Sequence, residues 1–198
     1  MKDKIQYYKE DIISLKSFIT EEIREKAAIL EGEIEYSADD NYAGRSTLLP
    51  QNLKSIINDR LITFGFNFSK LLYGRLRVAN HNDINSFHSL VHTDHQCHWV
   101  LVLYLENSLF INDEIAGTYF WESNFTKKRL LNLKVPTDLV KHSLVIERDS
   151  ADLSKWTQWL NCPFVEGNAL LFNSLYFHSP PSPLFEKKSP GKRITLDL

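Results

Sequence analysis

The stretch HTDHQCHWVLVLYL, from His92 to Leu105, decides the expected fold class of this chain. Its second half, Trp99–Leu105, is apolar at consecutive positions, which is typical of a strand packed between two layers. Its first half places a histidine and an acid two residues apart, at the end of a strand expected over 87–94. Side chains at i and i+2 of a strand point to the same face, so His92 and Asp94 can present an imidazole nitrogen and a carboxylate oxygen side by side.

Two later segments complete a candidate site. His178 can add a second imidazole. Two histidines and one carboxylate form a face that leaves the opposite positions of a metal open, as is characteristic of non-haem Fe(II) oxygenases. On the last expected strand, Arg193 and Thr195 share one face. A fixed cation beside a hydroxyl suits a carboxylate of a co-substrate.

Other readings of the histidines remain open. The chain also holds His88, His95 and His98 around Cys97, so a zinc-dependent hydrolase or isomerase is one alternative. Structural zinc sites use paired ligands with a second pair elsewhere, but Cys162 is the only other cysteine and there is no CxxC. Satisfied core histidines are a second alternative. A non-catalytic jelly-roll or cupin-like binding domain is a third, against which the presence of all three ligands and the arginine argues.

The bulk properties are those of one globular domain over 1–198. Hydrophobic residues make up 43% and charged residues 24%, which is ordinary for a globular protein. The net charge of −2 gives no electrostatic reason to expect nucleic acid as a partner. Two cysteines argue against a disulfide scaffold and for buried thiols in a reducing compartment. We find no secretory signal and no membrane-spanning run, so we expect a cytoplasmic protein without membrane partners.

Helical patterns come first along the chain, and strand patterns follow. Thr20 is a good N-cap for a helix that ends at Gly32, and Pro50 suits the first position of a second helix. The apolar stripe of that second helix is Leu53, Ile56, Ile57 and Leu61. We expect strands over 5–13, 71–79, 87–94, 99–105, 116–121, 140–147, 167–172, 175–178 and 193–198, and a short helix over 154–159. This order indicates helices packed on an antiparallel sandwich or barrel.

The chain resembles the Fe(II)/2-oxoglutarate-dependent oxygenases, and most closely their prolyl-hydroxylase-like branch, from about Leu71 to Leu198. The matching positions are His92-Thr93-Asp94, Trp99–Leu105, Gly117-Thr118, Gly167–Phe172, His178 and Arg193-Ile194-Thr195. The resemblance implies an α+β, mainly β fold. Its core over 71–198 is a double-stranded β-helix, or jelly-roll, and residues 1–70 supply supporting N-terminal helices.

The resemblance also implies roles for the site residues. It implies Fe(II) held by His92, Asp94 and His178. Arg193 would pair with the distal carboxylate of the co-substrate 2-oxoglutarate, and Thr195 or Tyr104 would add a hydrogen bond. The implied enzyme is a dioxygenase that consumes dioxygen, releases succinate and CO2, and hydroxylates an unactivated C–H. Because halogenating relatives replace the carboxylate by a small residue, Asp94 predicts an oxygen-driven oxidation and not halogenation.

The separation of His178 and Arg193 is longer than is usual in this family, and the additional residues are rich in proline. A proline-rich insertion can sit outside the barrel, so Arg193 stays the expected anchor. Lys188 and Lys192 are the substitutes.

The expected substrate is a small amino-acid-like or peptidyl molecule. Tyr73, Arg75 and Arg77 share one face of a strand next to the metal strand, where Arg75 could bind a substrate carboxylate. The alternative is an outward face whose arginines form ion pairs on the barrel exterior. Trp121 supplies a bulky wall, and residues 122–136 are a candidate loop over the site mouth.

Overall fold

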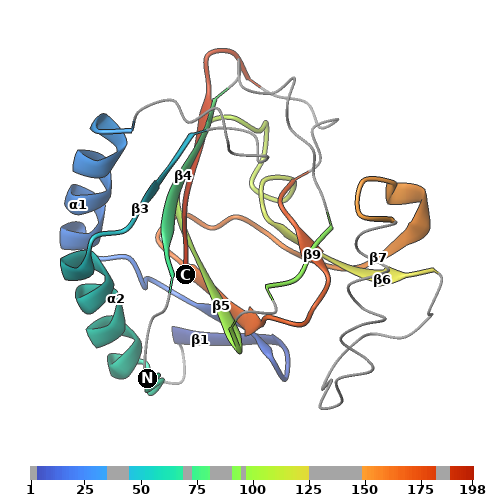
Figure 1. The fold of residues 1–198 in the computed structure, drawn as a ribbon, viewed down its shortest axis with the longest axis horizontal. Coiled ribbons are helices and arrows are strands. Elements are labelled where there is room, and N and C mark those ends of the chain that lie inside the picture. Colours follow the sequence, from blue (N-terminus) through green and yellow to red (C-terminus); the bar gives the residue numbers. More distant parts are fainter. Residues whose placement is uncertain are drawn as a thin grey trace.

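The computed structural model describes residues 4–34, 45–68, 73–80, 91–94, 97–124, 149–181 and 188–198. Two helices lie on one side of a large antiparallel sheet, and a small sheet lies on its other side (Figure 1). This layered, mainly β arrangement confirms the jelly-roll with supporting helices. In the described part of the chain, neither helix is long and apolar enough to cross a membrane.

The large sheet has seven strands, and all of its pairings are antiparallel. Its order is β1 (Ile5–Lys9), β2 (Ile12–Leu15), β8 (Ala169–Asn173), β5 (Trp99–Asn107), β10 (Lys192–Asp197), β4 (Arg75–Asn80) and β3 (Arg45–Leu48). The small sheet has the order β7 (Trp156–Cys162), β6 (Thr118–Ser123) and β9 (His178–Ser179). A short 3-10 helix, η3 (Leu153–Lys155), leads into β7.

The helices form where their caps and apolar spacing predict. In α1 (Glu21–Gly32), the Thr20 side chain accepts a hydrogen bond from the backbone N–H of Ile23. Pro50 is the N-cap of α2 (Gln51–Thr63) and not its first residue, so the helix begins one residue later than expected. The apolar stripe of α2 is buried at Leu53, Ile57 and Leu61. A helix stripe of this kind needs an apolar surface opposite, which the large sheet provides.

β5 separates two hydrophobic cores. Leu101, Leu103 and Leu105 belong to the core under the helices. Val100, Val102 and Tyr104 belong to the core between the two sheets. Alternate side chains of one strand therefore fill both layers, which confirms the expectation of a strand that is apolar on both faces.

Several expected elements differ in the structure. Residues 5–13 form a hairpin because the polar pair Glu10-Asp11 turns the chain between β1 and β2. The helix expected over 154–159 is one turn only, since Trp156 already begins β7 and pairs with β6. Residues 1–70 hold β1, β2 and β3 as well as the two helices. The strand expected over 140–147 and the first half of the one over 87–94 lie outside the described residues. The second half, 91–94, forms only an isolated bridge at His92.

A close approach at Gly191 brings the last strand into place. A Cβ at this position would lie 2.5 Å from the carbonyl oxygen of Ser108, so a larger residue would force the chains apart. Immediately afterwards the backbone N–H of Ser108 donates to the carbonyl oxygen of Lys192. β10 then runs between β5 and β4, with its side chains facing the space between the two sheets at alternate positions.

Candidate active site

Three potential metal ligands come together at one end of that space. The ligand atoms of His92, Asp94 and His178 all lie within 4.8 Å of one another. Nε2 of His178 is 3.2 Å from Oδ2 of Asp94. Two ligands at right angles around one ion, each about 2.1 Å from it, are about 3 Å apart. The measured separation therefore suits adjacent positions on one metal ion.

Backbone hydrogen bonds fix this group, although its members are far apart in the sequence. His92 and His178 exchange both backbone hydrogen bonds, each 2.9 Å long, in a single antiparallel bridge. The backbone N–H of Asp94 donates to the carbonyl oxygen of Ser174. Nδ1 of His178 lies 3.0 Å from the carbonyl oxygen of Tyr176, which directs Nε2 toward Asp94. Such a partner for the second imidazole nitrogen is the usual support of a metal-binding histidine.

The charge state of Asp94 also suits a ligand. Burial favours the neutral carboxyl, but the hydrogen bond with His178 and the electrostatic influence of His178, His92 and Arg77 outweigh burial. The pKa of Asp94 is therefore held well below its ordinary value. The side chain is an anion at neutral pH, as a metal-bound carboxylate must be.

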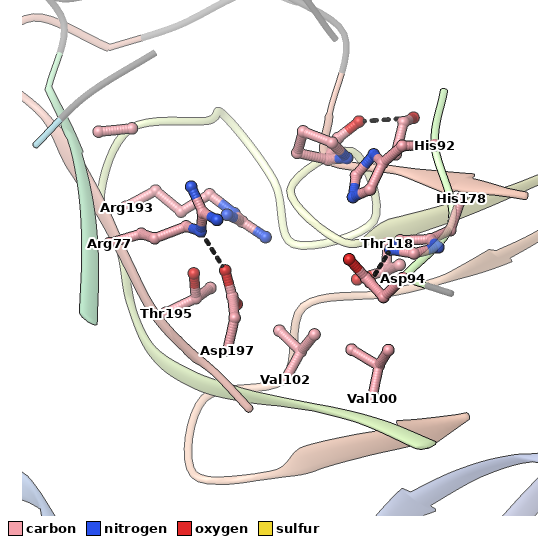
Figure 2. A pocket seen from close by; sticks show the side chains of 13 residues that line it. Arg77, His92, Asp94, Val100, Val102, Thr118, His178, Arg193, Thr195 and Asp197 are labelled. Atoms are coloured by element: carbon pink, nitrogen blue, oxygen red, sulfur yellow. Dashed lines mark hydrogen bonds and ion pairs between the residues drawn. The ribbon is translucent and has the colours of Figure 1, made fainter. Parts of the chain in front are cut away.

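A cavity of about 120 Å³ connects this group to a second polar end. Figure 2 shows His92, Asp94 and His178 at one end and Arg193, Arg77, Thr195 and Asp197 at the other. Val100 and Val102 of β5 lie between the two ends. The other described lining residues are Ala79, Thr118, Ser179 and Pro180. The cavity thus joins two charged ends across an apolar floor.

Arg193 is the buried cation of the second end. The residue is only 8% exposed, and its Nε donates to the carbonyl oxygen of Ala116 at 2.9 Å. The guanidinium carbon lies 5.6 Å from the centre of the Phe164 ring. Burial lowers the pKa of Arg193, but an arginine stays protonated in proteins. No carboxylate among the described residues forms an ion pair with this guanidinium, so it is suited to an incoming anion.

Comparisons with known proteins bear on the fold that holds these residues. No protein-family model matches the chain, and no curated protein matches its sequence. Among solved structures, the non-haem α-ketoglutarate-dependent carbocyclase SnoK from nogalamycin biosynthesis is 14% identical with a TM-score of 0.59, over 100% of this chain and 82% of that one. α-Ketoglutarate is another name for 2-oxoglutarate. The chain has the fold of the 2-oxoglutarate-dependent oxygenases.

Two further structures share this oxygenase fold. The epimerase SnoN from nogalamycin biosynthesis, also a non-haem α-ketoglutarate-dependent enzyme, is 9% identical with a TM-score of 0.56, over 96% of this chain and 77% of that one. HygX from Streptomyces hygroscopicus, solved with nickel, 2-oxoglutarate and hygromycin B bound, is 13% identical with a TM-score of 0.53. That match covers 98% of this chain and 82% of HygX. These similarities show the fold of the chain and do not assign roles to its residues.

Within the oxygenase fold, the hydroxyls expected near Arg193 take different positions. Thr195 is buried and lines the cavity directly. The Tyr104 hydroxyl shares a hydrogen bond of 2.8 Å with Oγ1 of Thr118, and Thr118 is the one that lines the cavity. Burial raises the pKa of Tyr104, so its phenol stays protonated. Tyr104 therefore contacts the cavity only through Thr118. The sequence pattern assigned no role to the Thr118 hydroxyl.

The two lysines named as substitutes for Arg193 lie elsewhere. Nζ of Lys192 forms ion pairs with Glu31 at 2.8 Å and Glu106 at 3.2 Å, away from the cavity lining. Lys188 is exposed and does not line the cavity either. Of the three cations considered, only Arg193 reaches the cavity.

The three residues expected to contact substrate do not themselves line the cavity. Tyr73 is 53% exposed, with its ring centre 5.3 Å from the guanidinium carbon of Arg75. Arg75 donates to the Ser46 side chain, and neither Tyr73 nor Arg75 lines the cavity. Nε1 of Trp121 donates to Oγ of Ser179, which does line it. Trp121 therefore reaches the cavity wall through Ser179, and the candidate mouth loop lies outside the described residues beyond position 124.

The zinc alternative has less support. His88 and His95 lie outside the described residues. Sγ of Cys97 donates a hydrogen bond to the carbonyl oxygen of Asp94, and burial raises the thiol's pKa to about 11. In the described part of the chain, the His92, Asp94 and His178 set is the only group of three potential ligands. Cys162 is buried and Cys97 is half-buried, and both are free thiols.

Proposed function

We propose that this protein is an Fe(II)- and 2-oxoglutarate-dependent dioxygenase. It would hydroxylate an unactivated C–H of a small amino-acid-like or peptidyl substrate, with consumption of dioxygen and release of succinate and CO2. One observation carries the proposal: a single cavity joins a three-ligand metal set to a buried arginine that forms no ion pair with a described carboxylate.

The metal end fits Fe(II). Two imidazoles and one carboxylate match the ligand set of non-haem Fe(II) oxygenases, and all three side chains line the cavity. A bound Fe(II) would supply the redox chemistry with dioxygen. The chain's own contribution is to hold three ligand atoms in place, with the ring of His178 oriented by the carbonyl of Tyr176.

The cation end fits the distal carboxylate of 2-oxoglutarate. Arg193 supplies a buried guanidinium and Thr195 a hydroxyl on the same side of β10. The cavity volume of about 120 Å³ is far below the roughly 300–1,000 Å³ of pockets that hold drug-sized ligands. This space suits a small dicarboxylate whose ends both carry charge. Val100 and Val102 would contact its methylene carbons.

The reaction type is inferred from the ligand set and not from the fold. Enzymes with this fold include a carbocyclase and an epimerase, so the fold permits several reactions. Asp94 supplies a carboxylate to the ligand set and so argues for an oxygen-driven oxidation over halogenation. Nε1 of Trp121 donates to Ser179 at the cavity wall, and Trp121 is the residue we propose for substrate contact.

An anaerobic absorbance titration tests the proposal. The protein is loaded with Fe(II) and titrated with 2-oxoglutarate, with Asp94→Ala as the matched variant. We expect a weak visible charge-transfer band in the unmodified protein and none in the variant. Succinate release across a panel of amino acids and short peptides would then identify the substrate class. Folded, iron-loaded protein that shows no band would count against the oxygenase and favour a binding domain or a zinc enzyme.

A further inference from the structure

We propose that Arg77 is a second recognition residue for the distal carboxylate of the co-substrate, and that Asp197 holds it in position. This inference rests on the proposed function and assigns a specificity-determining role that the sequence pattern did not suggest.

The position of Arg77 is the first observation. Arg77 lies on β4, directly across from Thr195 of β10 in the sheet register. It lines the same cavity as Arg193, and Figure 2 shows both guanidinium groups at the end away from the metal ligands. Arg77 therefore faces the place where the distal carboxylate would lie.

The ion pair with Asp197 is the second observation. Nε of Arg77 lies 2.5 Å from Oδ2 of Asp197, on the neighbouring strand. Because Nε is the guanidinium nitrogen nearest the chain, this contact fixes the direction of the whole side chain. The Arg77 and Asp197 side chains are 31% and 29% exposed, whereas Arg193 is 8% exposed. The pair thus stands nearer to solvent than the buried anchor.

The charge balance of this end is the third observation. Arg193 and Arg77 are positive and Asp197 is negative, so the three together leave one net positive charge. Without Arg77, the charge of Asp197 would cancel that of Arg193. An arriving carboxylate would then meet an end with no net charge. Arg77 therefore decides whether this end attracts the second carboxylate of a dicarboxylic oxo acid.

A purely structural role predicts a different behaviour. A cross-strand ion pair between half-exposed side chains contributes little to stability, about 0–1 kcal/mol. Its loss would change the thermal stability of the protein slightly and would not distinguish one oxo acid from another. Discrimination between a dicarboxylic and a monocarboxylic oxo acid is therefore the informative measurement.

The experiment compares two ligands on Fe(II)-loaded, anaerobic protein by titration calorimetry. 2-Oxoglutarate carries the distal carboxylate, and 2-oxopentanoate has the same chain length without it. For Arg77→Gln we expect Kd for 2-oxoglutarate to rise by about tenfold or more, in line with loss of a charge-assisted hydrogen bond. The Kd for 2-oxopentanoate should stay within about twofold. Arg75→Gln, which alters an arginine on the same strand outside the cavity, should leave both constants unchanged.

The double variant Arg77→Gln/Asp197→Asn separates contact from simple neutralisation. If Arg77 contacts the carboxylate, the double variant still binds 2-oxoglutarate several-fold more weakly than the unmodified protein does. Full recovery of affinity would overturn the contact. So would an equal loss for both oxo acids, or no loss in the single variant.

Failure of this inference and failure of the proposed function give different results. If the unmodified protein binds neither oxo acid, the proposed function itself is wrong. If it binds 2-oxoglutarate and Arg77→Gln binds it equally well, only the role of Arg77 is overturned. Thermal unfolding of each variant verifies that the proteins compared are folded.

Discussion

The two ends of the cavity are built in different ways. At the cation end, Arg193, Thr195 and Asp197 alternate along β10, and Arg77 stands across from Thr195 on β4. These side chains are fixed by the regular ladder of six residue pairs between β10 and β4, although the pairing of β10 with β5 shifts register between Ile194 and Thr195. At the metal end, His92 belongs to an isolated bridge and His178 to a strand of two residues. Those ligands are held by a few individual hydrogen bonds.

This difference shows where each function is vulnerable. A side chain in the middle of a ladder keeps its place when one neighbour changes, because the strand's other hydrogen bonds remain. A ligand on a short segment depends on each of its supports. For Asp94, one such support is the hydrogen bond to the Ser174 carbonyl. We therefore expect changes around the metal end to affect the site more than equal changes around the cation end.

The largest expected effect is at a metal ligand. Asp94→Ala removes the only carboxylate of the ligand set, so iron affinity should fall by more than about a hundredfold, beyond the usual effect of losing an outer partner. The fold should persist, since Asp94 is not part of either core. Calorimetric iron binding and thermal unfolding test both statements. Iron-dependent turnover retained in this variant would remove Asp94 from the ligand set.

The cation end should respond next, and separately. Arg193→Gln removes the buried positive charge while keeping a polar side chain near the Ala116 carbonyl. The 2-oxoglutarate concentration needed for half-saturation should rise by about tenfold to a hundredfold, because a charge-assisted hydrogen bond is lost. Iron affinity should not change. An unchanged 2-oxoglutarate requirement would overturn the anchor role of Arg193 and leave Arg77 as the other described cation of the cavity lining.

A smaller effect should come from a support behind the metal end. Trp156 is buried, and its Nε1 donates to the carbonyl oxygen of Asp149. It packs in a small cluster with Val91 and Phe177, each of which precedes a ligand in the chain. Trp156→Phe should lower the free energy of unfolding by about 1–3 kcal/mol, because the smaller ring leaves the cluster underpacked and the Asp149 carbonyl keeps only its hydrogen bond from the backbone N–H of Asp152. Chemical denaturation measures this loss. Iron binding weakened more than 2-oxoglutarate binding would support the comparison, and the reverse order would contradict it.

The smallest expected effect is remote from both ends. Thr20 caps α1 on the far side of the large sheet. Thr20→Ala should lower the free energy of unfolding by about 1 kcal/mol and leave iron and 2-oxoglutarate binding unchanged. The same denaturation and binding measurements apply. A change in either binding constant would show that the ends are less independent of the helical layer than the structure indicates.

The sequence predicted those features that depend on the spacing of residues close together in the chain. The alternation of β5 and the cap at Thr20 follow from short-range rules, and the structure confirms both. The histidine and acid two residues apart, with a late histidine and arginine, were also readable, and the structure gathers them in one cavity. Their roles remain proposals. The first part of β7 was predicted to be helical because its pairing with β6 cannot be read from the segment alone.

The missed residues share a physical cause. Arg77 and Asp197 are charged and lie near strand ends, where such residues usually face solvent. Strand alternation from Arg193 and Thr195 already places Asp197 on their face, but only the register between β10 and β4 brings Arg77 beside them. Thr118 was named only as part of the Gly117-Thr118 match and received no role, since a threonine on a strand shows none until the Tyr104 hydroxyl is placed beside it. Long-range pairing decided these positions, and one sequence does not reveal it.

The reciprocal bridge between His92 and His178 has a consequence for handling the protein. The bridge joins the segment leading into the large sheet to a strand of the small sheet, so a metal bound to these side chains would fasten the same two parts together. By mass action, a metal present at one hundred times its Kd would stabilise the folded chain by about 2.7 kcal/mol if the unfolded chain does not bind it. The melting temperature therefore also reports the fraction of the protein that holds a metal. A panel of divalent ions ranked by that temperature would reveal which ion the triad prefers before any substrate is known.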